Sequence, residues 1–261
     1  MSDQPSTGAE RFLFSEEGIL RGDFKHYFLT KRFNFIAMLN NYRDLSDLFL
    51  HIDQDWLEVI TDLSQIHNPE WIVPVQLTIF CFRELRLAAE MLLSGCTTPG
   101  FSHLRSALES FVQAQKILRE PALGIVWLGR DDDQKEYNKH FKANFKANLF
   151  PETSGLQHLH VIWQMLCDAG PHPSVTSIGV SSTITKSQQD MKWAFNFFEV
   201  QPEELTKNLL FMLRVSLELY KVTYSSFHER LSADTERLKR LHSHLNQFHE
   251  LKRLYGPPAM P

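Results

Sequence analysis

Apolar side chains recur every three or four residues over most of this chain, which is the spacing of one buried face on an α-helix. The clearest stretch runs from Pro99 to Glu120, just after the turn residues Thr97 and Thr98. Its apolar positions form a single stripe over about five helical turns: Phe101, Leu104, Leu108, Phe111, Val112 and Leu118. We therefore predict a helix at Pro99–Glu120 with one face in the core.

Two other segments have the composition of buried helices. Pro74–Leu93 is apolar nearly all round in its first half and amphipathic in its second, and Gly95 is a typical helix-ending residue. Because only a short link separates this segment from Pro99–Glu120, we expect the two helices to form an antiparallel hairpin. Glu203–Phe227 is long and mostly apolar, and we expect it to pack against this hairpin.

Helical spacing also occurs nearer the N-terminus, at Lys31–Phe49 and Asp53–Ile66, and again at Leu156–Ala169. Before these helices, aromatic residues crowd between Arg11 and Thr30 around two glycines. For this region we predict a segment that wraps around the domain with little regular structure.

Three further segments have mixed signals. Arg130–Phe150 contains a tandem Phe-Lys-Ala-Asn repeat, and we interpret it as a helix with a basic side. Ser174–Lys186 alternates and is rich in β-branched residues, which favours a small β-hairpin. Met191–Val200 is aromatic, and we predict a short helix there.

Together these patterns predict an all-α fold, a single-domain bundle of about seven to nine helices with room for a small β-hairpin near residues 174–186. An N-terminal wrapping segment at 1–30 would precede the bundle domain at 31–230. A C-terminal amphipathic helix and tail would occupy 231–261, and this helix is the one segment that we expect to project.

Composition narrows the class of partner. Hydrophobic residues make up 43% and charged residues 22%, which is ordinary for a globular protein. The net charge of −4 gives the whole molecule no general attraction to nucleic acids or anionic membranes. The longest apolar run, Trp71–Phe82, is too short to span a bilayer, and the N-terminus lacks the pattern of a signal peptide. We predict a cytoplasmic protein without a membrane partner.

Cysteine and histidine spacing favours neither a metal nor a cofactor. The three cysteines, Cys81, Cys96 and Cys167, are widely separated, which is typical of free thiols in a reducing compartment. His158 and His160 would point in different directions on a helix, and no phosphate-binding glycine motif is present. The sequence therefore predicts no cofactor and no metal site.

The candidate chemistry is concentrated in three side chains. Arg105 and Glu109 lie one helical turn apart at the edge of the apolar stripe. One possibility is an ion pair that orients two helices. The other is a site in which Arg105 binds an anion while Glu109 holds Arg105 or His172 in position. His172 lies between Pro171 and Pro173, where it is either a structural turn residue or a general acid or base.

Two surfaces are candidates for binding a macromolecule. Lys135, Lys139, Lys142 and Lys146 form either a solvated basic face or a strip facing RNA or phosphate. On the final helix, four apolar residues follow a spacing close to a heptad and form the C-terminal seam: Leu238, Leu241, Leu245 and Phe248. This seam packs on the body of the same chain or on a second copy, and we predict a homodimer through it.

The segment Leu104-Arg105-Ser106-Ala107-Leu108-Glu109, followed downstream by His172-Pro173-Ser174, resembles a family of uncharacterised, mostly bacterial helical proteins. That family is distantly similar to HEPN (higher eukaryotes and prokaryotes nucleotide-binding) domains, several of which are metal-independent ribonucleases or toxins. The resemblance implies a polar cluster of Arg105, Glu109 and His172. HEPN nucleases have an Arg and a His in one helix with four to six residues between them, and His172 has no such Arg before it.

Two classes of function follow. The absence of an enzyme motif and the C-terminal seam favour a non-catalytic interaction or regulatory module. The alternative is a HEPN-like metal-independent ribonuclease, a toxin or a phage-defence component, which the resemblance and the four lysines favour. Whether the chain is an enzyme is left open by these patterns.

Overall fold

The computed structural model describes residues 24–169, 182–186, 191–195, 197–199, 201–228, 231 and 235–256. In these ranges the chain forms ten α-helices, one short 3₁₀ helix and a two-stranded sheet, which confirms the all-α class. The elements are α3 (Phe24–Asn41), α4 (Arg43–Leu63), α5 (Pro69–Leu93), α6 (Thr97–Arg119), α7 (Leu123–Leu128), α8 (Gln134–Phe141), α9 (Phe145–Leu149), η1 (Glu152–Ser154), α10 (Gln157–Ala169), β1 (Ser182–Lys186), β2 (Met191–Phe195), α12 (Pro202–Phe227) and α13 (Thr235–Tyr255).

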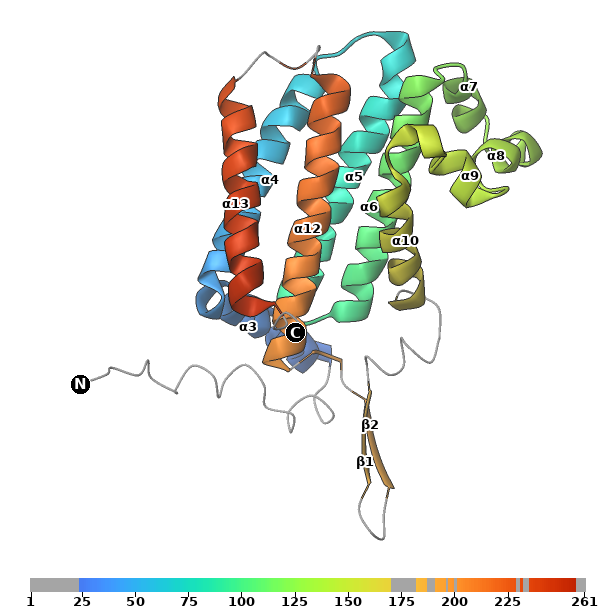
Figure 1. Ribbon diagram of the computed structural model, residues 1–261. Coiled ribbons are helices and arrows are strands. Elements are labelled where there is room, and N and C mark those ends of the chain that lie inside the picture. Colours follow the sequence, from blue (N-terminus) through green and yellow to red (C-terminus); the bar gives the residue numbers. More distant parts are fainter. Residues whose placement is uncertain are drawn as a thin grey trace.

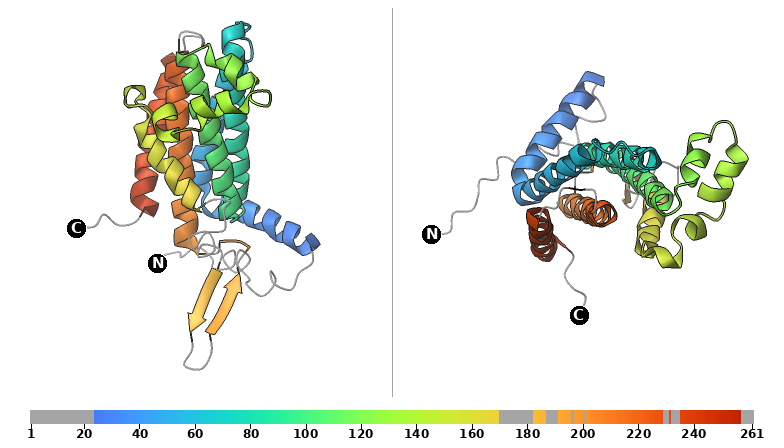
Figure 2. Two further views of the ribbon diagram at one scale, coloured as in Figure 1. Left: turned by 90° about the vertical axis from the view of Figure 1, so that its right-hand side faces the viewer. Right: turned by 90° about the horizontal axis from the view of Figure 1, so that it is seen from above.

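Six helices lie side by side in two layers (Figures 1 and 2). Seen from above, α4, α5 and α6 form a curved row, and α13, α12 and α10 form a second row beside it (Figure 2). Across the layers, α13 packs on α4, α12 on α5, and α10 on α6. The helix α3 crosses one end of the bundle and belongs to neither layer (Figure 1).

The predicted α5–α6 hairpin is confirmed, although both helices begin a few residues earlier than expected. The side chain of Asn68 accepts a hydrogen bond from the backbone N–H of Glu70, and Pro69 occupies the first turn, so α5 starts at a well-capped site. Between the helices, Gly95 has a φ of 78°, a left-handed conformation that glycine adopts at little cost.

Close contact between α5 and α6 depends on a second glycine. A Cβ placed on Gly100 would lie 2.6 Å from Cγ of Leu92, so a side chain at this position would force the helices apart. The predicted stripe on α6 continues from this contact, with Leu104, Leu108 and Phe111 fully buried. The hairpin is therefore the centre of the hydrophobic core.

The two layers are joined by aromatic contacts. The ring of Trp56 on α4 stacks on Phe82 of α5 at 5.9 Å and meets Tyr220 of α12 edge-on at 5.6 Å. These three side chains join three helices in one cluster. The prediction that Glu203–Phe227 packs against the hairpin is confirmed.

The prediction that the C-terminal helix projects is wrong. α13 lies along α4 and α12, with Leu241, Phe248 and Leu251 buried against them. The alternative in which the C-terminal seam packs on the same chain is the one observed. Only Leu238 of the seam remains exposed.

The N-terminal boundary was also misplaced. Residues 24–30 were expected to lack regular structure, yet they form the first turns of α3, and Tyr42 separates α3 from α4. The second half of α3 was predicted as the start of the helix at Lys31–Phe49. Its first turns were not predicted, because apolar and polar residues alternate around α3 and leave no single stripe along its whole length. The rest of the expected wrapping segment lies outside the described residues.

Arg130–Phe150 is not one helix. It divides into α8 and α9, and Asn144, with a φ of 50°, reverses the chain inside the tandem repeat. The ammonium group of Lys116 on α6 donates to the carbonyl of Asn148 at 3.0 Å and holds α9 against the bundle. Tertiary contacts therefore override the local helical pattern, and the short helices raise the count above the predicted seven to nine.

A β-hairpin is present, but it is displaced along the chain. Ser182–Lys186 pairs antiparallel with Met191–Phe195, so the predicted short helix at 191–200 is wrong over the second strand. Residues 174–181, where the first strand was expected, lie outside the described residues. Of the helices that the structure describes, none is long and apolar enough to cross a membrane.

Candidate functional site

Arg105 and Glu109 meet a third side chain, Trp163, at the contact between α6 and α10. The Nε of Arg105 donates to Oε1 of Glu109 at 2.8 Å. The indole Nε1 of Trp163 donates to the same oxygen at 2.9 Å. One carboxylate therefore orients both its neighbour on α6 and an aromatic side chain on α10, as expected of a boundary ion pair that positions two helices.

The aromatic side of this cluster is extensive. The guanidinium of Arg105 lies 5.8 Å from the centroid of the Trp163 ring, and the other contacts of that ring are with Phe145 at 4.4 Å and His160 at 5.8 Å. The sequence predicted the helix at Leu156–Ala169 that carries Trp163, but it gave no sign that Trp163 binds Glu109. A contact between residues of two different helices leaves no pattern in the sequence of either helix.

The side chain of Arg105 is charged and partly exposed to solvent. Burial tends to lower the pKa of Arg105, but the hydrogen bond and charge of Glu109 raise it above the ordinary value for arginine. Its side chain is 23% exposed, and in the described structure its hydrogen bond is made through Nε, not the terminal nitrogens. The terminal nitrogens can contact an anion.

The structure brings two of the three predicted site residues together. His172 lies outside the described residues, so only Arg105 and Glu109 are placed. The thiol of Cys167 on α10 lies near them, and burial raises its pKa although the charge of Arg105 opposes this change.

The four predicted lysines do not share one helix. Lys135 and Lys139 are on α8, Lys142 is in the turn and Lys146 is on α9, and all four are exposed. The ammonium group of Lys139 lies 3.2 Å from the carboxylate of Glu136. The continuous strip expected from a single helix is therefore divided by the turn at Asn144.

An ion ladder joins α4 to α13 along a buried edge. Arg240 Nε donates to Asp55 at 2.7 Å and its Nη2 to Glu58 at 2.6 Å, while Arg237 Nη1 donates to Asp62 at 2.8 Å. The Nε2 of His244 lies 2.9 Å from the other oxygen of Asp55. These side chains repeat three and four residues apart on both helices, so the ladder fixes the register of α13.

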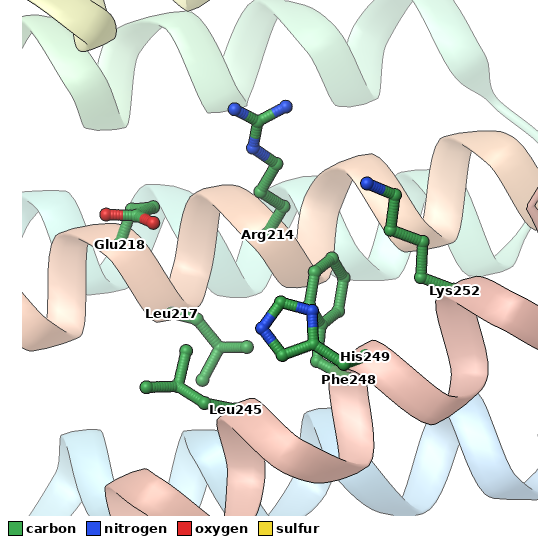
Figure 3. A pocket seen from close by; sticks show the side chains of 7 residues that line it. All are labelled: Arg214, Leu217, Glu218, Leu245, Phe248, His249 and Lys252. Carbon is green, nitrogen blue, oxygen red and sulfur yellow. The ribbon is translucent and has the colours of Figure 1, made fainter.

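A groove of about 290 Å³ runs between α12 and α13 (Figure 3). Its lining residues are Arg214, Leu217, Glu218, Leu245, Phe248, His249 and Lys252. Leu217 and Phe248 are buried and form the floor, whereas Arg214 and Lys252 are exposed. The sequence did not predict this groove, because its walls come from two helices and neither helix alone shows a pattern for it.

A large apolar surface covers the outer side of α3, which we call the α3 face. It consists of the exposed side chains Phe24, Phe28, Leu29, Phe33 and Ile36. The opposite side of α3 is anchored to the bundle: Met38 is buried, and Lys31 forms an ion pair with Glu90 at 2.8 Å. The α3 face therefore lies on a helix that is fixed from behind.

The α3 face is basic as well as apolar. Lys25 and Arg32 are exposed among its apolar side chains, and α3 contains no acidic residue. The rings of Phe24 and Phe28 meet at 4.6 Å, and Phe28 meets Tyr27 at 5.6 Å, so the aromatic side chains at the start of α3 are in contact with one another.

Within the described ranges, no group of three or more His, Cys, Asp or Glu side chains is arranged to hold a metal ion. No protein-family model, curated protein or solved structure matches the chain at a significant level.

Proposed function

We propose that this protein is a non-catalytic interaction module of the cytoplasm and that the α3 face is its docking surface. The partner is an acidic amphipathic segment of another protein. The observation that carries the proposal is a set of large apolar side chains that stay exposed on a helix which the described chain covers on one side only.

Large apolar side chains are normally buried in the core of a soluble protein. Phe24 is 76% exposed and Phe33 is 63% exposed, values far above those of a core residue. Since aromatic side chains carry about 150–250 Å² each, the α3 face offers roughly 500 Å² of apolar surface. Patches of this size are at the upper end for monomers and are often functional.

Charge selects the kind of partner. Lys25 and Arg32 lie within the apolar surface, so a second copy docked through the same face would bring like charges together. An acidic segment would neutralise both cations while covering the aromatic side chains. A helix laid along a helix with acidic edges has this chemistry.

Two synthetic amphipathic helices with the same leucine face test the proposal. One carries Glu and the other Lys at its polar edges, and binding is followed by fluorescence anisotropy. The acidic peptide is expected to bind at least about tenfold more tightly. Phe33→Ser and Arg32→Glu should each weaken its binding, whereas Ile125→Ser, at an exposed apolar residue on α7, should not.

Other occupants of the α3 face would give different results. A second copy would double the mass in light scattering, and Phe33→Ser would restore the monomer. Binding to anionic vesicles with no preference between the peptides would indicate a lipid surface instead. Tighter peptide binding after deletion of residues 1–23 would mean that this segment competes for the same face. Equal binding of both peptides contradicts the proposal.

The alternative function is a HEPN-like metal-independent ribonuclease, toxin or phage-defence component. The terminal nitrogens of Arg105 support it, because they can contact a scissile phosphate, with His172 as general acid or base. Lys135, Lys139, Lys142 and Lys146 would then contact RNA. Cleavage of RNA in the presence of a chelator, lost in Arg105→Ala and His172→Ala, would establish this alternative.

A homodimer through α13 is a separate proposal about assembly. With most of the C-terminal seam covered by α4 and α12, a second copy would bind the outer side of the helix. Leu238 and Leu254 are exposed there and support such a contact.

A further inference from the structure

We propose that the groove between α12 and α13 binds a small amphipathic anion, namely a carboxylate or phosphate that carries a short alkyl or aryl body. The anionic head would contact Arg214 and Lys252, and the body would lie on the apolar floor. This inference does not depend on the α3 face, which belongs to a different element.

The floor of the groove is apolar and mostly buried. Leu217 and Phe248 are buried and Leu245 is partly buried, with one contribution from α12 and two from α13. The groove measures about 290 Å³, close to the lower limit of ligand sites. A body of this size is that of a small molecule and not of a folded segment of protein.

The rim of the groove is cationic and has unused charge. In the part of the chain that the structure describes, neither Arg214 nor Lys252 forms an ion pair within 4.0 Å. Figure 3 shows Arg214 extending from α12 and Lys252 from α13 towards the same side of the groove. Two cations from different helices therefore line the same side of the groove, where either can contact the head of an anion.

The acidic residue of the groove cancels only part of this charge. Glu218 lies one turn after Arg214, but the two do not form an ion pair, and the carboxylate of Glu218 lies 3.6 Å from Nε2 of His158 on α10. Two cations face one carboxylate, so a net positive charge remains. His249 lies beside Phe248 on the rim and supplies a further ring nitrogen as a hydrogen-bond donor. The remaining positive charge and the apolar floor together favour an anion with an apolar body over a bare ion.

Isothermal titration calorimetry with octanoate, octanol and inorganic phosphate tests this inference. Octanoate is expected to bind saturably with a Kd below about 1 mM, and octanol and phosphate about tenfold or more weakly. Arg214→Gln and Lys252→Gln should each weaken octanoate binding by about fivefold, the loss of one charge-assisted contact at a partly exposed site. Lys221→Gln removes the same charge from an exposed position on α12 outside the groove and is the matched control.

Several results would overturn the inference. If octanol bound as tightly as octanoate, the two cations would not contribute to binding. If phosphate bound as tightly as octanoate, the apolar floor would not contribute. If Lys221→Gln weakened octanoate binding as much as the other two substitutions, binding would depend only on the net charge of the protein. Absence of octanoate binding at millimolar concentration would exclude the site. Unchanged thermal melting of the three variants verifies that each one is folded.

Discussion

Leu108 is the residue at which the chain pattern and the structure agree most closely. It lies in the middle of the α6 stripe, and its side chain is completely buried. The surrounding hairpin cannot collapse easily, because Gly100 already brings α5 and α6 into contact. We predict that Leu108→Ala lowers the free energy of unfolding by about 2–5 kcal/mol. Urea denaturation measures this change, and a loss below about 1 kcal/mol would mean that the stripe is not core.

His160 provides a test of pH dependence at the same scale. Its ring packs against Phe150 and Trp163, and burial, with the nearby charge of Lys146, lowers its pKa below the ordinary value of 6.5. The unfolded chain therefore takes up the proton first, so stability falls as the pH drops through 6.5.

We predict that the wild-type protein loses more stability between pH 7.5 and pH 5 than His160→Gln does. Urea melts of both proteins at the two pH values give the comparison, and the variant cancels contributions from the other histidines. A larger loss in the variant would mean that the sign of the pKa shift is wrong.

At the scale of the element, α13 is held by charge as much as by apolar packing. Removing Arg240 would leave the buried carboxylate of Asp55 with His244 alone and take one partner from Glu58. We predict that Arg240→Ala costs about 1–3 kcal/mol, since the buried carboxylate of Asp55 loses its arginine and keeps only His244.

The matched control for this prediction is on the same helix. Arg253 pairs with Glu250 at 2.7 Å, but both side chains are exposed, so Arg253→Ala should cost less than about 0.5 kcal/mol. Equal costs for the two substitutions, measured by urea denaturation, would show that the ion ladder contributes no more than a surface pair.

Some of the helices could be predicted from the sequence alone, and others could not. The α5–α6 hairpin and α12 were predicted well because each carries a periodic apolar stripe or a long apolar run between clear capping and turn residues. The first turns of α3 were missed because its apolar residues form no single stripe, and the break at Asn144 was missed because the contact of Lys116 with Asn148 is tertiary. Local periodicity is enough to predict single helices, but it does not predict which helices pack against one another.

The same distinction applies to the candidate site. Arg105 and Glu109 were predicted as a pair because four residues separate them on one helix. The contact of Trp163 with Glu109 spans 54 residues, and the groove between α12 and α13 depends on a helix that was expected to project. Features that join distant segments leave no pattern within either segment.

At the scale of the whole molecule, the homodimer through α13 stays a prediction. It implies a mass of twice 30.4 kDa at micromolar concentration in light scattering, and Leu238→Ser with Leu254→Ser should halve that mass. A wild-type monomer under these conditions contradicts it. Deleting residues 231–261 is not an equivalent test, because the deletion would expose the α4 and α12 surfaces that α13 covers.

The ion ladder has a consequence for the growing chain on the ribosome. Asp55 and Arg240 are 185 residues apart, so at synthesis rates of about 5–20 residues per second α4 waits roughly 10–40 s for its partner helix. During that interval three carboxylates on α4 lie without their cations, while α5 and α6 can already pair as a local hairpin. Those charges keep this edge of α4 hydrated until α13 emerges, and they protect the nascent protein from association through the surface that α13 will cover.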